Sequence, residues 1–548
     1  MARIDLAQLD WTLAGARPFE WMFNPAALGV RADVGPVPAR VPGSVQQALL
    51  DAGLVEDWHV GLQARDCAWV EQRHWCFSAE IPAETVPLGE RAVLDAEGLD
   101  YAGWILVDGK QVAAFEGMMT PHRFDLTECL GDSAAHRLAI VFDQTPPEQG
   151  QCGYSSKSRY FKSRYNYGWD WCPRIVPTGV WEPLTLRTGV DAACAVRRVA
   201  TDLDARSVRV AVGFDAAISG DAPARALRVT VCDDGKAVGT VSTSIVNGEN
   251  VLTLTDLDIE PWWPNGAGPQ KTYTLEVSAV DDADAALWST SRKIAFKRVE
   301  WRACEGAPAD AEPWLCVVNG KPVFLQGANW VPVRAVYHDI TEADYRELIA
   351  LYKDMGANIL RVWGGGILER EIFYDLCDEA GIFVWQEFPL SSSGVENCPP
   401  SEPAVIAKLE TIAVSYIERR AHHVSLLVWS GGNELMSDKP EERDRPVGYG
   451  HPCIAMFKAL VERQDPAHRF IATSPSGPRF CASATEYGQG LHHDIHGPWG
   501  FNPEAPDLEG WRAYWAGDDA LFRSETGMPG ASSVALIEHY AGHEPYWP

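Results

Sequence analysis

The chain has 548 residues, enough for several domains at roughly 100 to 200 residues each, so the whole cannot be one small binding module. Acidic residues outnumber basic ones by 75 to 47, and the net charge of −28 disfavours nucleic acid or an anionic membrane as the main partner. The 22 tryptophans suit the apolar faces of sugars, but most tryptophans fill cores, so composition alone only hints at a carbohydrate ligand.

The first part of the chain, residues 1–192, has the pattern of an all-β domain. Short segments rich in β-forming residues are separated by turn residues, at 75–81, 91–96, 104–107 and 136–143. Asp108-Gly109 stands between two such segments and is a strong hairpin signal. We therefore predict a β-sandwich.

The second part, residues 193–300, alternates more regularly. Apolar residues occur at every second position in four segments, 207–212, 227–231, 251–254 and 273–277. About 100 residues with strands at short intervals predict a small immunoglobulin-like sandwich, although the cysteine pair of antibody domains is not evident.

The third part, residues 301–548, alternates strands with helices. Thr341 and Asp344 have the spacing of a capping box, which predicts a helix that runs to Met355 and stops at Gly356. A second helix is predicted over Glu369 to Ala380, ended by Gly381. Parallel strands joined by helices predict a (β/α)8 barrel, here with about seven strands and without a convincing eighth strand and helix. The predicted strands are 323–326, 358–363, 382–386, 426–429, 470–473, 493–496 and 521–525.

Two features bear on the cellular compartment. The 13 cysteines are odd in number and contain no C-x-x-C pair, which favours a reducing compartment. Asp5 and Asp10 interrupt any apolar core of a signal peptide, and no run of 18 apolar residues predicts a membrane span. We predict a cytoplasmic protein without a membrane partner.

Two glutamates are the candidate catalytic residues. Glu434 follows the fourth predicted strand in Trp429-Ser-Gly-Gly-Asn-Glu, and Glu525 ends the seventh. Strand ends of a barrel converge, so the two carboxyl groups can face each other across the distance of about 5 to 5.5 Å that retaining glycoside hydrolysis needs. One carboxyl must then be protonated and the other ionised, which their mutual repulsion favours.

Further polar and aromatic residues lie at the ends of the predicted strands. Asn433 can donate to a sugar hydroxyl. Trp363 is expected either to stack on a sugar or to pack in the core, and Arg361 either to orient the nucleophile or to pair with a structural carboxylate. Glu387 is either a hydrogen-bond partner behind the site or a surface residue.

Other patterns favour a simpler interpretation. The cluster His492-His493-Asp494-Ile-His496 lacks a further ligand motif, so no metal is predicted. Lys157, Arg159, Lys162 and Arg164 are interpreted mainly as surface charges of the sandwich, and alternatively as charges that steer the segment ahead of Trp169. A mechanism with two carboxylates requires no cofactor, and none is predicted.

An ordered set of motifs along nearly the whole chain resembles glycoside hydrolase family 2, and within it the β-mannosidases. The set consists of Val41-Pro-Gly-Ser-Val-Gln, Glu97-Gly-Leu-Asp, Gly168-Trp-Asp-Trp-Cys-Pro-Arg, Trp262-Trp-Pro-Asn-Gly-Ala-Gly-Pro-Gln, Gly327-Ala-Asn-Trp-Val-Pro, Arg361-Val-Trp-Gly-Gly-Gly, Trp385-Gln-Glu-Phe, Gly431-Gly-Asn-Glu, Asp494-Ile-His-Gly-Pro-Trp and Ser524-Glu.

The resemblance implies a jelly-roll-like first sandwich and a retaining enzyme that removes terminal β-D-mannose residues. It implies that Glu434 is the general acid and then the base, and that Glu525 is the nucleophile. It also implies that the segment Trp169-Asp170-Trp171 reaches the mouth of the barrel, that Asp170 binds hydroxyls of the terminal mannose, and that His496 lines the sugar site.

The length of the chain and its motifs are compatible with several alternatives. Members of the family usually continue well past the nucleophile, whereas this chain ends at Pro548. The chain is therefore expected to be a natural short form, a fragment, or one half of a split enzyme. Its expected protein partner is a C-terminal partner chain or a second copy of itself in a homo-oligomer. Other sugars of the family, namely glucosamine, galactose and glucuronic acid, and a non-catalytic sugar-binding role are the alternatives to β-mannosidase activity.

Overall fold

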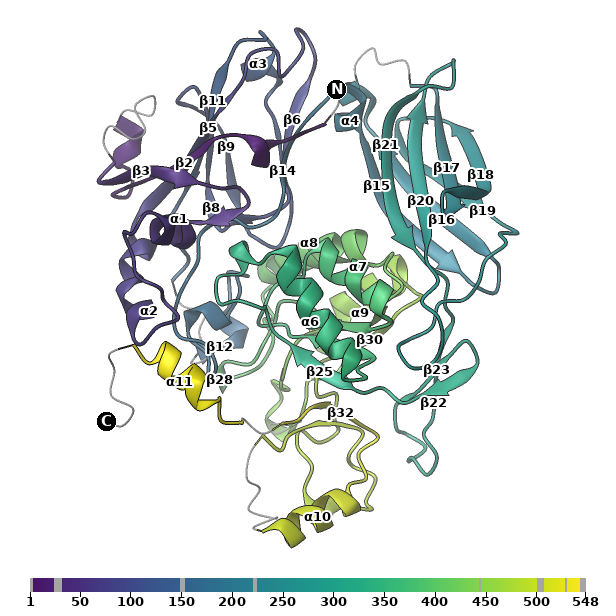
Figure 1. Ribbon diagram of the computed structural model, residues 1–548. Helices are drawn as coiled ribbons and strands as arrows, with labels where there is room; N and C mark the ends of the chain where they lie inside the picture. The colour runs from purple at the N-terminus through teal and green to yellow at the C-terminus, as the bar shows by residue number, and fades with distance from the viewer. Residues whose placement is uncertain are drawn as a thin grey trace.

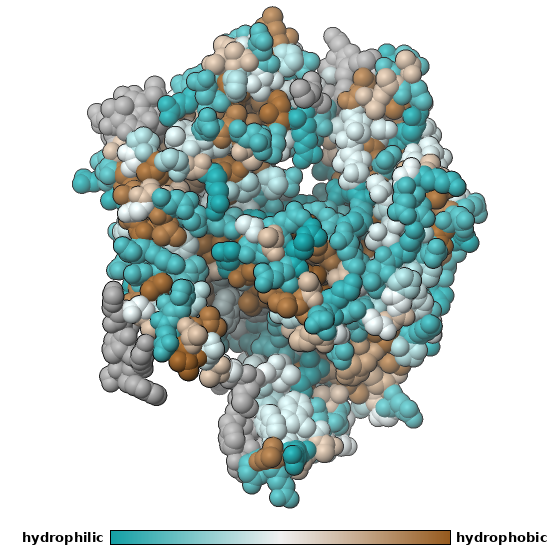
Figure 2. Space-filling view, viewed as in Figure 1, coloured by the Kyte–Doolittle hydropathy of each residue, from teal (hydrophilic) through white to brown (hydrophobic). Residues whose placement is uncertain are grey.

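The computed structural model describes residues 3–23, 32–147, 153–219, 224–442, 445–499, 507–527 and 530–542. Figure 1 shows two bodies made mainly of strands above a sheet that is covered by helices. On the face in Figure 2, hydrophilic residues are widespread and hydrophobic ones are scattered among them. In the described residues no helix is both long and apolar enough to span a bilayer.

The first body is a β-sandwich, as predicted. Its buried core contains Phe77, Leu94 and Ile140 from facing strands. The predicted hairpin is confirmed, because Asp108 and Gly109 adopt φ angles of +50° and +78° between paired strands. One sheet has the order β3 (Val34–Ala39), β2 (Trp11–Ala16), β5 (His74–Ile81), β11 (His136–Phe142), β8 (Ala102–Val107), β9 (Lys110–Glu116), and the other β1 (Arg3–Asp5), β14 (Leu184–Thr188), β6 (Ala92–Ala96), β10 (His122–Asp125).

The second body is also a sandwich of two antiparallel sheets. Alternate residues such as Val210, Val229 and Leu275 fill the core between the sheets, which confirms the predicted strands. The sheets are β15 (Cys194–Asp202), β16 (Ser207–Phe214), β19 (Gly248–Leu254), and β18 (Lys236–Ser244), β17 (Ala226–Asp233), β20 (Tyr273–Val280), β21 (Ala286–Ile294).

The third body contains seven parallel strands among the described residues. Five form one sheet in chain order, and two form a second sheet. Helices cover the outer side of the larger sheet in Figure 1. The strands are β25 (Gly327–Trp330), β26 (Ile359–Val362), β27 (Phe383–Glu387), β29 (Leu426–Ser430) and β30 (Arg469–Ile471), then β31 (Asp494–His496) and β32 (Phe522–Glu525).

The predicted helices form with small shifts at their ends. The capping box of Thr341 and Asp344 opens α6 (Glu342–Asp354), and Gly356 follows with φ +86°. Gly381 ends α7 (Glu371–Ala380) in the left-handed region. The start of α7 was predicted two residues too early, because Glu369 is instead buried and accepts a hydrogen bond from Trp330 Nε1 at 2.8 Å. Further along the chain are α8 (Pro403–Arg420) and α9 (Pro452–Gln464).

The first parallel strand does not lie where the sequence suggested. Residues 321–323 form β24 (Lys321–Val323), which pairs antiparallel with β23 (Leu315–Val318), and Phe324 is 83% exposed. The β-forming residues of 323–326 favoured a strand, but the turn at Asn319-Gly320, with φ angles of +48° and +85°, reverses the chain into a hairpin. The parallel sheet therefore begins only at Gly327.

A segment of the first sandwich crosses to the barrel. β12 (Gly153–Tyr154) pairs with β28 (Gly394–Glu396), and Ser155 Oγ donates to the Ser391 carbonyl at 2.6 Å. Arg164 Nη1 donates to the same carbonyl at 3.0 Å. The interpretation of residues 157–164 as surface charges was wrong for two of them, because Lys162 and Arg164 are buried at this junction.

Candidate active site

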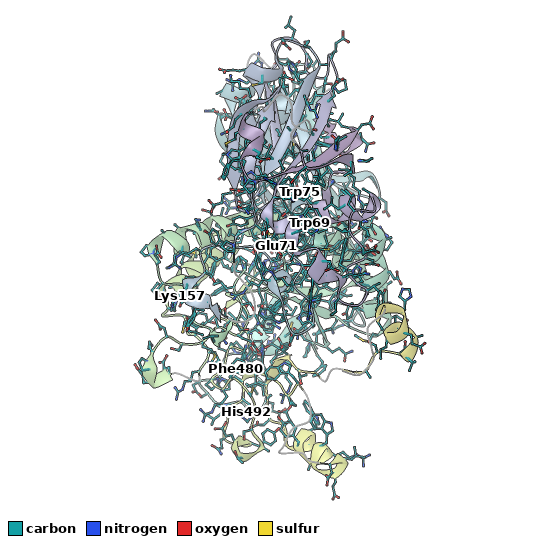
Figure 3. All side chains as sticks on the ribbon, turned by 90° about the vertical axis from the view of Figure 1, so that its left-hand side faces the viewer. Trp69, Glu71, Trp75, Lys157, Phe480 and His492 are labelled. Atoms are coloured by element: carbon teal, nitrogen blue, oxygen red, sulfur yellow. The ribbon has the colours of Figure 1, made fainter. Side chains whose placement is uncertain are left out.

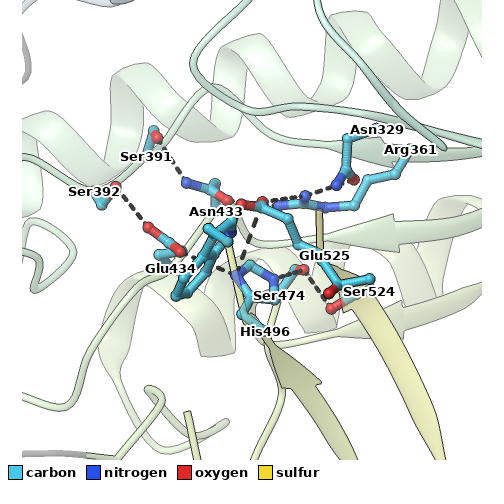
Figure 4. Close-up of polar contacts among 12 residues, drawn as sticks. Asn329, Arg361, Ser391, Ser392, Asn433, Glu434, Ser474, His496, Ser524 and Glu525 are labelled. Carbon is cyan, nitrogen blue, oxygen red and sulfur yellow. Dashed lines mark hydrogen bonds and ion pairs between the residues drawn. The ribbon is translucent and has the colours of Figure 1, made fainter. Parts of the chain in front are cut away.

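Glu434 and Glu525 meet at the carboxyl ends of the parallel strands (Figure 4). Glu434 follows β29, and Glu525 is the last residue of β32. One oxygen of each carboxyl group and one ring nitrogen of His496 all lie within 4.8 Å of one another. Residues 91 positions apart in the sequence are thus brought into one cluster, as the convergence of barrel strands requires.

A sharp backbone turn presents Glu434. Glu434 itself has φ +54° and Gly432 has φ +149°. A side chain at Gly431 would place its Cβ 2.2 Å from the Ala472 carbonyl oxygen. Non-glycine residues rarely adopt the left-handed region, and such strained residues cluster at functional sites. The Glu434 N–H donates to the Ser474 carbonyl at 2.6 Å, which holds the turn in place.

The side chain of Glu434 is in contact with neutral partners. Ser392 Oγ donates to Oε2 at 3.1 Å, and His496 Nδ1 lies 3.0 Å from Oε1. Burial raises the pKa of this carboxyl group, and the Ser392 hydrogen bond and the charge of Arg361 offset only part of that effect. A raised pKa suits a carboxyl group that has to give up a proton near neutral pH.

Glu525 is held by two hydrogen-bond donors. Arg361 Nη1 lies 2.9 Å from Oε2, and Trp499 Nε1 donates to Oε1 at 2.8 Å. These contacts suit an ionised carboxylate, which only accepts hydrogen bonds. The two glutamates therefore have different surroundings, one with neutral partners and one with a cation.

Arg361 connects the site to the sheet beneath it. Its guanidinium group lies 3.0 Å from Glu387 Oε1, 2.8 Å from Asn329 Oδ1 and 2.6 Å from Asn433 Oδ1. Burial alone would lower the pKa of Arg361, but the charges of Glu387 and Glu525 outweigh it and raise the pKa. The surface alternative for Glu387 is wrong, because its side chain is fully buried.

His496 lies at the end of β31 with its ring fully buried. Burial lowers its pKa to about 3, and the charge of Arg361 adds to this effect while that of Glu525 opposes it. The ring is therefore neutral near pH 7. Its second nitrogen, Nε2, lies 2.7 Å from Ser474 Oγ.

The other histidines of the same cluster face elsewhere. His492 Nδ1 lies 2.6 Å from Asp519 Oδ1, and His493 Nε2 lies 3.1 Å from the Gly490 carbonyl. Figure 3 shows His492 in the lower part of the molecule, beneath Phe480 and far from Trp75 of the first sandwich.

Outside the site, Glu371, His422 and His423 also bring three ligand-type atoms within 4.8 Å of one another. Arg420 Nη1 already lies 2.5 Å from the Glu371 carboxylate, and Arg292 Nη1 lies 3.6 Å from it. Two cations thus already neutralise this carboxylate.

Three predicted tryptophans form a cluster between the first sandwich and the barrel. Trp363 follows β26, and its ring centroid lies 4.9 Å from that of Trp169 and 6.0 Å from that of Trp171. Trp363 is buried, whereas Trp171 is 45% exposed. Asp170 is exposed and makes no hydrogen bond or ion pair with another described residue.

Three residues that touch the glutamates were not singled out from the sequence. Trp499 stands at the end of a quoted motif, and Ser474 follows β30 at the same edge of the barrel as the predicted residues, so position alone could have suggested both. Ser392 lies in a loop after β27, and no sequence pattern marks it.

Comparisons with known proteins identify two domains. The family described as "Glycosyl hydrolase 2 galactose-binding domain-like" matches residues 21–182. The family described as "Glycosyl hydrolases family 2, TIM barrel domain" matches residues 312–470.

Similar curated proteins extend over nearly the whole chain. A β-mannosidase B of Emericella nidulans is 26% identical over 92% of this chain and 61% of its own length. A β-mannosidase B of Thermothelomyces thermophilus is 28% identical over 92% and 60%, and a mouse β-mannosidase 25% identical over 93% and 61%. The chain thus spans about three fifths of the length of these relatives.

Solved structures share the fold. A β-D-mannosidase of Dictyoglomus thermophilum has a TM-score of 0.78 and 24% identity, over 98% of this chain and 64% of that one. An exo-chitosanase of Amycolatopsis orientalis has a TM-score of 0.70 and 16% identity, over 98% and 60%.

Proposed function

Because the chain belongs to glycoside hydrolase family 2, we propose that it acts as a retaining exo-glycosidase on terminal non-reducing β-D-mannose residues. The observation that carries this proposal is the meeting of Glu434 and Glu525 with their carboxyl oxygens within 4.8 Å. Retaining glycosidases have carboxyl groups about 5 to 5.5 Å apart, whereas inverting ones leave about 6.5 to 9.5 Å for a water molecule.

The first chemical step uses both glutamates. Glu434 gives its proton to the glycosidic oxygen while the bond between that oxygen and the anomeric carbon breaks. Glu525 attacks the same carbon and forms a covalent glycosyl-enzyme. Arg361 and Trp499, which bind the two oxygens of Glu525, orient the attacking carboxylate.

The second step returns the enzyme to its starting state. The Glu434 carboxylate takes a proton from a water molecule, whose oxygen attacks the anomeric carbon and releases Glu525. Two displacements on opposite faces leave the configuration of the sugar unchanged.

Residues around the glutamates would bind the terminal sugar. The exposed carboxylate of Asp170 is suited to accept hydrogen bonds from sugar hydroxyls, and the exposed face of Trp171 to pack on the ring. Asn433 uses its Oδ1 for Arg361 and one N–H for Ser391 Oγ at 3.1 Å, which leaves a second N–H for a hydroxyl. Asp170 and Trp171 would thus form one wall of the proposed sugar site. Trp363 packs against the ring of Trp171 on the side of the barrel.

Mannose is favoured over the other sugars of the family by the relatives, several of which are named β-mannosidase. The nearer alternatives are a β-glucosaminidase, a β-galactosidase and a β-glucuronidase. The proposal covers terminal β-mannose on a mannan fragment, on an N-glycan core or on another glycoside.

A panel of 4-nitrophenyl β-glycosides tests the proposal. The wild-type chain is expected to release nitrophenol from the mannoside, and Glu434→Gln and Glu525→Ala to lose that activity. Preference for another glycoside would keep the mechanism and change the sugar. Turnover equal in all three proteins would contradict the assignment of both glutamates.

The second candidate function is sugar binding without catalysis, or catalysis that requires a C-terminal partner chain or a homo-oligomer. The observation in its favour is that β25 and β32 belong to separate sheets, with a cavity of about 110 Å³ beside them. Asn329, Trp385 and Glu525 line this cavity. Sedimentation velocity together with the glycoside assay would reveal an oligomer or an inactive monomer.

The domain limits and the compartment belong to the same proposal. We divide the chain into a jelly-roll-like sandwich at 1–192, an immunoglobulin-like sandwich at 193–300 and a (β/α)8-type catalytic domain at 301–548, with seven parallel-sheet strands among its described residues. The cysteines of the described residues all carry free thiols, which supports a cytoplasmic location.

A further inference from the structure

A chain of hydrogen bonds determines which nitrogen of His496 carries the proton. Ser474 Oγ donates to Ser524 Oγ at 2.9 Å. A hydroxyl group has only one hydrogen, so Ser474 Oγ can take part in its 2.7 Å contact with His496 Nε2 only as an acceptor. Nε2 therefore carries a hydrogen.

The other nitrogen, Nδ1, is then left with a lone pair. A doubly protonated ring is disfavoured because the imidazole is fully buried and because the positive Arg361 lies nearby. The charged groups that face the ring are Glu434, Arg361 and Glu525, whose Oε2 lies 3.8 Å from Nδ1. Asp494, two residues earlier, accepts instead from the Ser476 and Ser524 backbone N–H groups.

Glu434 Oε1 lies 3.0 Å from Nδ1, the nitrogen that carries this lone pair. Two acceptors at this distance repel each other unless one of them carries a hydrogen. We propose that His496 is a positioning residue whose Nδ1 accepts the proton of Glu434 and so keeps this carboxyl group protonated until a substrate binds. The inference rests on the proposed role of Glu434 as the general acid.

The reverse arrangement would have the opposite effect. If Nδ1 carried the hydrogen, it would donate to Glu434 and favour the carboxylate, which cannot serve as an acid in the first step. The direction in which the Ser474 hydroxyl group donates thus decides whether His496 favours the protonated or the ionised form of Glu434.

The same contact helps in the second step. In the first step the glycosidic oxygen replaces Nδ1 as the acceptor of the Glu434 proton and keeps that proton when the bond to the sugar breaks. The remaining carboxylate then faces the Nδ1 lone pair. Their repulsion is relieved when Glu434 takes a proton from the attacking water, so His496 favours both halves of the cycle.

The tautomer can be measured without turnover. The chain has 14 histidines, and ¹⁵N labelling of their rings gives spectra in which protonated and bare nitrogens are well separated. The signals lost in His496→Gln identify this ring, and His493→Gln serves as the control for a nearby histidine outside the site. We expect a hydrogen on Nε2 and none on Nδ1 at neutral pH. A hydrogen on Nδ1 would overturn the proposal, whether or not the chain is active.

Kinetics provide the second test. His496→Gln can keep the contact of Nε2 but has no acceptor at the place of Nδ1, whereas the amide oxygen of His496→Asn can occupy that place. For a 4-nitrophenyl glycoside, which needs an acid, His496→Gln should lose roughly 10- to 100-fold in kcat/KM, and the basic limb of its pH profile should move to lower pH. For a 2,4-dinitrophenyl glycoside the loss should stay within about 3-fold, and His496→Asn should restore most of the activity.

These outcomes separate the two proposals. Equal losses with both leaving groups, or an unchanged basic limb, would assign His496 a purely structural role. An inactive wild-type chain whose Nε2 is protonated would contradict the proposed function of the isolated chain and leave the inference about His496 standing.

Discussion

The hydrogen bond from Trp499 to Glu525 can be removed by a single substitution with little other change. The side chain of Trp499 is 41% exposed, so its removal should disturb the core little. In Trp499→Phe the proposed nucleophile Glu525 loses the 2.8 Å hydrogen bond to Oε1 while an aromatic ring remains. We expect kcat/KM for a dinitrophenyl glycoside to fall about tenfold, which corresponds to about 1.4 kcal/mol.

The control for this prediction is Trp511→Phe, a tryptophan whose ring contacts Tyr514 and Trp515, away from the glutamates. Both variants should unfold within about 0.5 kcal/mol of the wild type in urea. A Trp499→Phe enzyme as fast as the control would show that Arg361 alone orients Glu525.

At the residue level, position in the barrel was the informative signal. Glu434 and Glu525 could be singled out because each stands at the end of a predicted strand. The contacts of Ser392 and Ser474 could not be predicted, because they depend on which loops fold over the barrel and on the direction of side chains. The burial of Glu387 follows from its partner Arg361, which lies on the neighbouring strand.

Gly327 of β25 pairs with Ile359 of β26, and the space beside it leaves no room for a side chain. A Cβ atom there would lie 1.7 Å from the Ile359 carbonyl oxygen. In Gly327→Ala, β25 must move away from β26, and we expect unfolding in urea to require about 2 kcal/mol less free energy. Because Asn329 of β25 contacts Arg361, the activity should fall as well.

Gly448→Ala is the matched control, since nothing lies within 4 Å of a Cβ atom at that position. If Gly327→Ala were as stable as Gly448→Ala, the register of β25 would have to differ from the one described.

Elements with a regular period were predictable from the sequence, and the exception has a local cause. The face of α8 formed by Val405, Leu409 and Ile412 is buried as its spacing indicates. The first barrel strand was placed too early because Asn319-Gly320 was not recognised as a hairpin turn. A single turn therefore shifted the start of the whole parallel sheet.

At the scale of the whole molecule, Arg164 links the segment that carries Trp169 and Trp171 to the barrel through its hydrogen bond to the Ser391 carbonyl. It is buried, and burial lowers its pKa to about 10. In Arg164→Leu the link to the Ser391 carbonyl is lost, so the wall of the proposed sugar site should loosen. We expect KM to rise about tenfold with kcat little changed, because the glutamates keep their own contacts.

Arg159→Leu removes an exposed arginine from the same segment, whose partner is Glu402 at 2.8 Å, and should leave KM unchanged. A fall in kcat with a constant KM for Arg164→Leu would mean that the junction supports the chemical step instead of binding.

The crossing segment also places two proposed tasks on two different parts of the chain. The proposed acid and nucleophile stand at the ends of barrel strands, whereas Asp170 and Trp171 come from a segment of the first body whose Phe161, Tyr165 and Cys172 pack in the same core as the barrel helices. Because Asp170 and Trp171 are exposed, substitutions there should change which sugar fits the proposed site while Glu434 and Glu525 keep their own contacts. In such an architecture a new specificity can evolve, or be engineered, while the catalytic machinery stays as it is.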